Sequence, residues 1–343
     1  MNEGVKKIIA KSLCSLGGDA ALRTINKHKV LVLTYHGVYR RSQAPIPLFT
    51  HLSDDLFRWQ LQFLKDHYHI LSMTEFVARL KAGADFPERS ALITFDDGFR
   101  NNYDVAFPVL KELGVPATIF LTVDFIGKLK MLWFDKLFLL LKRYLRTGTS
   151  LGQIHHQLVE QKEVTNLHDL YEVATALYKT MSDAEKNERL DALTAESDLS
   201  EDPLAAQFML MSWENVTEMF KSGLVDFGVH TATHRILRGL VAEEYSREID
   251  VPRKTLSKRL GREVSTFSYP NGIPDRDFFT EHEDYLKRCG YSCAFSTRVA
   301  LNDMTTGGRY RLNRIAIGND LTSDRHLFPL RIAGLAAAGR KEC

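Results

Sequence analysis

The sequence contains few cysteines and no long apolar run. Its four cysteines among 343 residues stand at positions 14, 289, 293 and 343. Cys289 and Cys293 enclose a glycine in a segment typical of a helix end followed by a strand. We therefore expect neither a disulfide framework nor a zinc site built from thiolates. No stretch reaches the roughly 20 apolar residues that a membrane-spanning helix needs.

An excess of one charge sign is also absent. The chain carries 45 Lys and Arg against 43 Asp and Glu, and the basic residues are scattered. A nucleic-acid-binding surface concentrates Lys and Arg on one face, so no nucleic-acid partner is expected. Apolar residues make up 44% of the chain and aromatic residues 10%. This composition is sufficient for the full core of a globular protein.

Residues 1–29 lack the uninterrupted apolar run of a secretory signal. A signal peptide has about 7–15 such residues, whereas the run here is broken by Lys11 and then by Gly17, Gly18 and Asp19. We expect a plain N-terminal helical segment and a cytoplasmic protein. The open alternative is an amphipathic helix lying on a membrane surface, which would make the protein peripheral to the membrane.

Short apolar strands alternate with helical patterns along most of the chain. The helices carry apolar positions at a period of 3.6 residues, and several end at glycine, the usual left-handed helix stop. This alternation predicts an α/β sheet or barrel with buried parallel strands. Strands are predicted at 30–34, 91–95, 117–123, 224–229, 265–269 and 291–296, and helices at 57–67, 74–81, 103–113, 213–221 and 242–260.

One long segment, residues 128–210, interrupts the alternation. It contains only helical patterns such as MLWFDKLFLLLKRYL, and we predict an inserted helical subdomain. The insertion separates a strand ending near Val123 from one ending at His230, so it is expected beside the face where both strands end. The predicted organisation, in chain order, is an N-terminal segment at 1–29, α/β domain at 30–127, insertion at 128–210, α/β domain at 211–325 and C-terminal tail at 326–343.

Two adjacent carboxylates follow a buried strand in TFDDG, at residues 94–98. Adjacent side chains at the end of a strand diverge. One of Asp96 and Asp97 can then bind a metal ion while the other contacts the water on that ion. Taken alone, Asp-Asp-Gly is also an ordinary turn sequence.

Two histidines four residues apart follow another strand in HTATH, at residues 230–234. This spacing brings both imidazoles together on one turn of helix or helical loop. Two histidines with a carboxylate make a three-ligand site that leaves positions open for water and substrate. Both motifs follow strands, and the carboxyl ends of parallel strands are where α/β active sites form. We therefore predict a catalytic metal site from His230, His234 and one of the two aspartates.

Two further strand ends carry polar groups. His36, in TYHG, has an imidazole whose ordinary pKa suits proton transfer near neutrality. The turn SYPNG at 268–272 has a backbone N–H that could face an oxyanion. Both segments also have ordinary interpretations, because a strand-end histidine is commonly structural and Tyr-Pro-Asn-Gly is a common turn sequence.

The motifs LTYHGV, TFDDG, HTATH and FSYPNG occur together between about residues 30 and 320. As a set they resemble the polysaccharide deacetylase family, the NodB-homology carbohydrate esterases. The early Tyr-His-Gly is similar to the branch that includes bacterial exopolysaccharide deacetylases. The resemblance implies a distorted (β/α) barrel of about seven parallel strands and one divalent metal ion, commonly zinc. Cobalt, nickel or manganese would also suit one carboxylate and two imidazoles.

The resemblance also implies a role for each motif residue. The metal ligands are matched by Asp97, His230 and His234. Asp96 matches the general base, and the Tyr269 backbone N–H matches the oxyanion donor. His36 matches the general acid, because the chain has no late Leu-x-His motif. The family's arginine that orients the base has no match in VSTFSYP, and we predict Arg314 as its substitute.

The implied activity is hydrolysis of the N-acetyl group of an amino sugar, in a polysaccharide or its precursor, during surface polysaccharide biosynthesis. An N-acetylated saccharide is the expected substrate. Arg100 and Asn101, directly after the Asp-Asp-Gly turn, are candidate contacts to its hydroxyl groups. Two alternatives stay open: an amidohydrolase acting on a non-sugar amide, and a catalytically inactive glycan-binding homologue. The sequence does not indicate an oligomeric state.

Overall fold

A parallel sheet forms the centre of the computed structural model, which describes residues 3–42, 48–147, 166–195, 199–306 and 308–335. The strand order is β10-β1-β5-β6-β7-β8-β9, and the short β4 (His69–Ile70) pairs with β5 beside this path. The strands are β1 (Leu31–Tyr35), β5 (Ser90–Phe95), β6 (Ala117–Leu121), β7 (Val225–Val229), β8 (Thr266–Ser268), β9 (Cys293–Phe295) and β10 (Ile315–Ala316). The predicted strands therefore exist, and β10 is one that the pattern did not reveal.

The two ends of this sheet are joined by one segment. Ile315–Ala316 pairs with β1, and Leu312 bridges Phe295 of β9 in parallel. The N–H of Ser296 donates to the carbonyl of Leu312 at 2.7 Å. The segment 312–316 thus spans the gap between β9 and β1 and curls the sheet into the distorted barrel of seven parallel strands that the sequence predicted.

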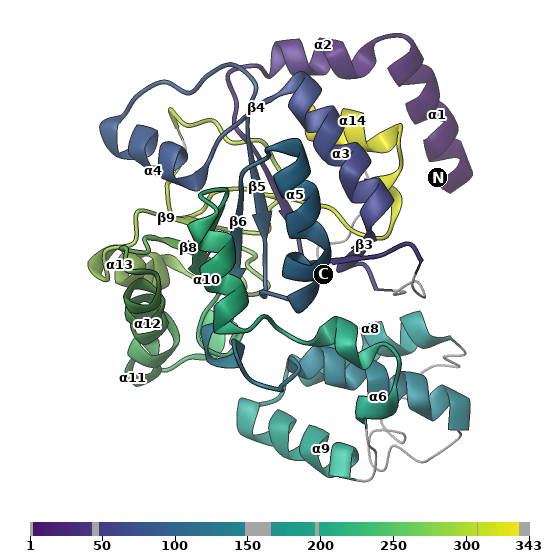
Figure 1. Cartoon of the computed structure of the whole chain (residues 1–343), viewed down its shortest axis with the longest axis vertical. Helices are drawn as coiled ribbons and strands as arrows, with labels where there is room; N and C mark the ends of the chain where they lie inside the picture. Colours follow the sequence, from purple (N-terminus) through teal and green to yellow (C-terminus); the bar gives the residue numbers. More distant parts are fainter. Residues whose placement is uncertain (1–2, 43–47, 148–165, 196–198, 307, 336–343) are drawn as a thin grey trace.

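Helices cover the outside of the barrel (Figure 1). They are α3 (Asp54–His67), α4 (Met73–Ala82), α5 (Phe107–Leu113), α10 (Trp213–Lys221), α12 (Val251–Leu260) and α13 (Thr280–Arg288). Two predicted helices contain a wider π turn, at Asn102–Ala106 and, after α11 (Ala242–Tyr245), at Ser246–Asp250. In each case a proline follows one residue into the helix, at Pro108 and Pro252. A proline lacks the N–H for the regular bond to the fourth residue back, so the preceding turn widens.

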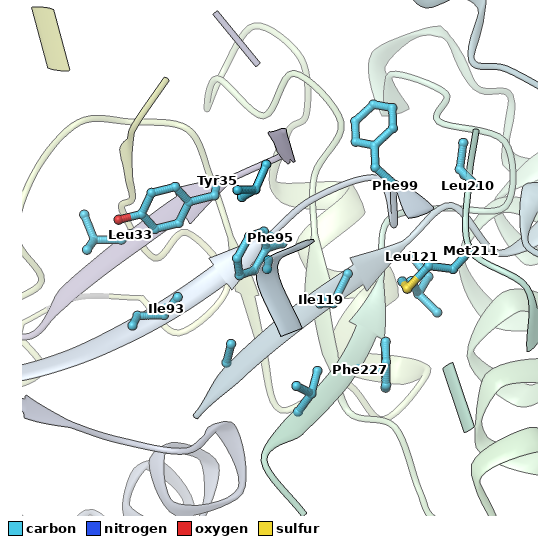
Figure 2. Packing of buried hydrophobic residues seen from close by; sticks show 14 of the residues in the cluster. Leu33, Tyr35, Ile93, Phe95, Phe99, Ile119, Leu121, Leu210, Met211 and Phe227 are labelled. Carbon is cyan, nitrogen blue, oxygen red and sulfur yellow. The ribbon is translucent and has the colours of Figure 1, made fainter. Parts of the chain in front are cut away.

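Alternate residues of each strand face opposite sides of the sheet. Odd-numbered side chains of β1, β5, β6 and β7 pack between sheet and helices, together with Phe99, Leu210 and Met211 (Figure 2). Even-numbered ones such as Val32, Leu92 and Phe120 form a separate cluster inside the barrel. A shift of one residue would exchange the two sets, so the apolar pattern fixes the register.

The described residues of the insertion are helical. They form α6 (Trp133–Thr147), α8 (Leu167–Tyr178), α9 (Asp183–Ala195) and two 3-10 turns, Leu199–Glu201 and Ala205–Phe208. These helices group together beyond the end of the sheet at the bottom of Figure 1. Apart from a single bridge of Leu210 to Phe99, residues 128–147, 166–195 and 199–210 contain no strand. The rest of the predicted insertion lies outside the described residues.

The two ends of the chain meet on one side of the barrel. Helices α1 (Glu3–Ser15) and α2 (Gly18–Ile25) form the expected helical segment and pack against α14 (Leu327–Ile332). The sequence assigned residues from 326 onward to a tail, but Phe328, Leu330 and Ile332 are buried. Because these apolar side chains are packed in the interior, the chain continues as helix α14 through residue 332. No helix in the described ranges is long and apolar enough to cross a bilayer.

Candidate active site

The two aspartates of TFDDG diverge at the end of β5. Asp96 continues the even-numbered row that faces the barrel interior, whereas Asp97 has φ of 71° and turns away. Gly98 also has positive φ, and a Cβ there would lie 2.7 Å from Leu121 Cδ2. This position therefore accepts only glycine without strain. Both carboxylates are buried, Asp96 being 3% and Asp97 1% exposed.

Asp96 is held by Arg314, which lies on the segment that closes the barrel. The guanidinium is fully buried and donates to both carboxylate oxygens, at 2.8 and 2.7 Å. Ser268 Oγ donates to the same carboxylate at 3.2 Å, and Arg314 Nε donates to the Ser296 carbonyl at 3.0 Å. Burial would raise the pKa of Asp96, but the charges of Arg314 and His230 and the hydrogen bonds from Arg314 together outweigh it and hold this pKa well below its usual range.

His230 and His234 follow β7 and converge on Asp97. Their Nε2 atoms lie 3.6 and 3.3 Å from Asp97 Oδ1, and their ring centroids are 4.8 Å apart. The segment between them is an irregular turn and not helical, because Thr231 and His234 adopt φ of 60° and 64°. Positive φ is uncommon for such residues and persists where surrounding contacts enforce it, often at functional sites.

Hydrogen bonds from neighbouring elements orient this turn. His230 Nδ1 lies 2.8 Å from the Ser268 carbonyl, which fixes the proton on Nδ1 and leaves Nε2 free to bind. Burial lowers the pKa of His230 to about 4, so the ring is neutral near pH 7. The buried carboxylate of Glu248 accepts from Thr233 N–H at 3.0 Å and from its hydroxyl at 2.9 Å. The turn is therefore anchored before any ligand binds.

The atoms of this cluster fit a divalent cation. One carboxylate oxygen of Asp97 and one ring nitrogen each of His230 and His234 lie within 4.8 Å of one another. Asp97 Oδ1 is buried and receives no hydrogen bond from any residue that the structure describes. Such an acceptor, together with two imidazole nitrogens, is the donor set of a three-ligand metal site with positions left open.

His36 stands at the end of β1, partly buried and beside the fully buried His51. The strand β2 (Gly37–Tyr39) pairs with β3 (His51–Ser53), which places the His51 ring on Gly37. A Cβ at residue 37 would lie 2.2 Å from His51 Cδ2, so TYHG requires its glycine. Burial, followed by the charge of His36, lowers the pKa of His51 to about 3. Sequence patterns gave no signal for His51, because the β2–β3 pairing alone brings it to the site.

The predicted oxyanion donor is wrong in detail. The Tyr269 N–H donates to the Phe295 carbonyl at 3.1 Å, because the hydrogen bonding to β9 continues one residue beyond the end of β8. The side chain is buried as well, with its hydroxyl donating to the Tyr310 carbonyl. Pro270 has no N–H, so Asn271 has the first N–H of this turn that no described acceptor takes.

The structure also corrects one of the two predicted substrate contacts, Asn101. Asn101 is buried, and its amide accepts from Val38 N–H and donates to the Gln207 carbonyl, both at 3.2 Å. It therefore ties the loop after β1 to the end of the insertion. Arg100 is exposed and pairs with Asp104 one turn along the chain at 3.1 Å. Both polar atoms of the Asn101 amide are therefore used inside the protein, whereas a substrate contact by Arg100 stays a prediction.

A cavity of about 630 Å³ opens between the barrel and the insertion. Its lining includes the metal-site residue His234, and the insertion provides much of the opposite side. The insertion residues that line the cavity include Trp133 and Lys136 of α6 and Lys186 and Leu190 of α9. Of the three residues Asp97, His230 and His234, only His234 lines this cavity, so the insertion borders the candidate metal site at His234.

Comparison with known proteins identifies the family. Residues 83–294, more than half of the chain, match the family described as polysaccharide deacetylase. The chain belongs to the polysaccharide deacetylase family. The matched range contains the TFDDG and HTATH motifs, and the remaining site residues His36 and Arg314 lie on either side of it.

Among curated proteins, this deacetylase-family chain is similar to two staphylococcal enzymes named poly-beta-1,6-N-acetyl-D-glucosamine N-deacetylase. It is 39% identical over 114 residues to the Staphylococcus epidermidis protein, which covers 29% of this chain and 38% of that protein. It is 29% identical over 178 residues to a Staphylococcus aureus protein, and this match covers 50% of this chain and 59% of that protein. The matches therefore span less than two thirds of either relative.

Solved structures of other deacetylases share the fold of this family member. The Streptococcus pyogenes deacetylase PplD in complex with acetate aligns over 88% of this chain and 98% of that chain, with a TM-score of 0.56 and 18% identity. IcaB from Ammonifex degensii aligns over 90% of this chain and 98% of that chain, with a TM-score of 0.56 and 19% identity.

Proposed function

We propose that this protein removes the N-acetyl group from an acetylated amino sugar, in an exopolysaccharide or its precursor, with the help of a divalent metal ion, zinc first. The observation that carries the proposal is the buried Asp97–His230–His234 cluster directly beside a carboxylate that Arg314 holds ionised. The names of the two staphylococcal relatives support a β-1,6-linked N-acetylglucosamine polymer as the substrate class.

In this proposal each residue has one task. Asp97, His230 and His234 hold the ion, which when bound polarises the acetyl carbonyl and lowers the pKa of the attacking water. Asp96 accepts the proton from that water as it attacks the carbonyl carbon. Arg314 keeps Asp96 ionised and pointed at the site. The Asn271 N–H, in place of Tyr269, is our candidate donor to the oxyanion.

His36 completes the reaction as the proton donor. The carbon–nitrogen bond breaks only when the leaving nitrogen takes up a proton, because an amine anion is a very poor leaving group. His36 lies close enough for its charge to act on both Asp96 and Asp97. Its backbone carbonyl accepts a 2.5 Å hydrogen bond from Asn102, which fixes the end of β1.

Acetate release from N-acetylglucosamine oligomers, β-1,6-linked and β-1,4-linked, tests the proposal. We expect metal-dependent release by the native protein and its loss by roughly 10²–10⁴-fold in Asp96→Asn, with bound metal retained. His230→Ala should lose the metal, measured by elemental analysis. His168→Ala is a matched control, because His168 is an exposed insertion histidine.

Three results would contradict the proposal. Release of acetate from simple amides such as acetanilide, but from no saccharide, would favour the non-sugar amidohydrolase. Tight binding of the oligomers without any acetate release, in protein shown to contain metal, would indicate an inactive glycan-binding homologue. Near-normal turnover in Asp96→Asn would remove Asp96 from the role of base.

A further inference from the structure

The insertion contributes a buried carboxyl group that has no partner. Asp135, in the first turn of α6, is 0% exposed. Neither of its oxygens makes a hydrogen bond to any residue within the described ranges. A buried carboxyl group without a partner is strongly unfavourable. Another buried carboxyl group, that of Asp96, has such a partner in Arg314. The exception at Asp135 therefore calls for a ligand.

Helix α6 has two buried faces, and Asp135 lies on the one toward the barrel. One face joins the insertion's own core through Leu137, Leu140 and Leu141. Phe138 and Leu139 join the barrel core instead. With 3.6 residues per turn, position 135 falls between positions 138 and 139 around the helix axis. The carboxyl thus replaces an apolar side chain in the middle of the barrel-facing stripe.

The neighbours of Asp135 on α6 touch the metal site. The Phe134 ring contacts the ring of His234, with centroids 5.1 Å apart. Phe138 contacts Phe208 at 5.8 Å, and Phe208 in turn contacts His51 at 5.4 Å. The side of α6 that carries Asp135 therefore covers the region between these two histidines.

Electrostatics agree with this placement. Burial raises the pKa of Asp135 well above its usual range, and the next cause is the charge of Asp97. Tyr171 of α8 is near enough for Asp135 to raise its pKa as well, after burial, but no hydrogen bond joins the two side chains. Asp135 does not belong to the cluster of metal-binding atoms around Asp97. It therefore faces the site without being a ligand of the ion.

We propose that Asp135 is a substrate-binding residue that forms a hydrogen bond with a hydroxyl group of the sugar whose acetyl group enters the metal site. A carboxyl group that holds its proton donates one hydrogen bond and accepts others, and a sugar hydroxyl can do the same. The sugar can form hydrogen bonds through its hydroxyl groups and its one amide N–H. The amide nitrogen is the leaving group that His36 protonates in the proposed reaction, so the hydroxyl groups remain for Asp135. This inference rests on the proposed N-deacetylase function. It assigns the insertion a direct role in choosing a polyhydroxylated substrate.

Asp135→Asn and Asp135→Leu test this role through two substrates. In Asp135→Leu kcat/KM for acetate release from an N-acetylglucosamine oligomer should fall roughly 10- to 100-fold, because a sugar hydroxyl is left buried without a partner. The fall should be smaller in Asp135→Asn, because an amide also donates and accepts hydrogen bonds. Hydrolysis of 4-nitrophenyl acetate, which has no hydroxyl group to recognise, should stay within about twofold, as should metal content. The melting temperature should stay equal or rise, because an unpaired buried carboxyl has been removed.

A matched control is Asp202→Asn, also in the insertion. Asp202 pairs with Lys142 at 2.7 Å and does not belong to the metal cluster, so its loss should reduce stability and leave both reactions unchanged. The inference is overturned if the Asp135 variants keep full activity on the oligomer, or if they lose metal and both reactions together. A lower melting temperature with unchanged kinetics on the sugar would mean that Asp135 stabilises the fold through Tyr171 and does not bind the substrate. A native protein that cleaves the ester but no acetylated saccharide would refute the proposed function itself and the sugar hydroxyl with it.

Discussion

At the scale of single residues, the ion pair of Asp96 and Arg314 is the most demanding feature of the site. Both groups are buried and joined by two short hydrogen bonds. Desolvation of two charges offsets much of their attraction, so such a pair adds little net stability. Removal of one partner is a different matter, because it leaves the other charge buried and uncompensated. The pair therefore serves orientation of the base more than stability.

Arg314→Met should destabilise the protein by about 3–5 kcal/mol, because it leaves the Asp96 carboxylate unpaired. The double variant Asp96→Asn/Arg314→Met should regain most of this loss, since neither charge remains. Urea unfolding of the two single variants and the double variant measures the coupling. Arg58→Met, which breaks the exposed pair with Glu112, should change stability little. Additive losses in the double variant would show that the two side chains do not act as a pair.

The residues that sequence patterns could predict are those next to strand ends. Asp96, Asp97, His230 and His234 form motifs because their positions are set within a few residues of one strand. Arg314 reaches Asp96 from 218 positions away, so the pattern could suggest it but could not give its contacts.

Other residues depend on long-range packing. His51 arrives through the β2–β3 pairing, and the Tyr269 N–H is taken by β9. Asp135 had a readable signal, an acidic residue inside an apolar helical stripe, that only the fold connects to the metal site.

At the scale of elements, α6 belongs to two cores at once. Phe138 and Leu139 are buried in the barrel core, while Leu137 and Leu141 are buried among α8 and α9. The sequence placed the insertion beside the site because of where its flanking strands end. Periodicity alone could not reveal that one of its helices completes the barrel core, since both faces of α6 read as apolar.

Replacement of residues 128–210 by a short linker should therefore abolish cooperative folding. It removes Phe138, for which truncation alone typically costs about 3–5 kcal/mol, and it uncovers the apolar residues beneath α6. Circular dichroism during heating measures the transition. A change confined to α9, such as Leu190→Ala, should leave a cooperative transition, because Leu190 lies only in the insertion's own core. A linker variant that still unfolds sharply would show that α6 is dispensable to the barrel.

At the scale of the whole molecule, buried titratable groups link stability to pH. Burial lowers the pKa of His51 to about 3 and of His230 to about 4, from 6.5. Both rings stay neutral in the folded protein while the unfolded chain takes up protons below pH 6.5, so stability is lost as pH falls from about 6.5 toward 4. The loss at pH 5 is about 2 kcal/mol for each histidine. Asp135 acts in the opposite direction, because its raised pKa lets the folded protein hold a proton that the unfolded chain has released.

Thermal melting of the metal-free protein between pH 7.5 and 5, at constant salt, separates these contributions. The native protein should lose stability toward pH 5, since two histidines outweigh one aspartate. His51→Phe, which places another ring between Phe99 and Phe208, should lose less, because one group that protonates only on unfolding is gone. Asp135→Asn should lose more, because the opposing group is gone, and its advantage over the native protein should be largest at pH 7.5. Parallel curves for all three proteins would mean that neither residue is buried as the structure places it.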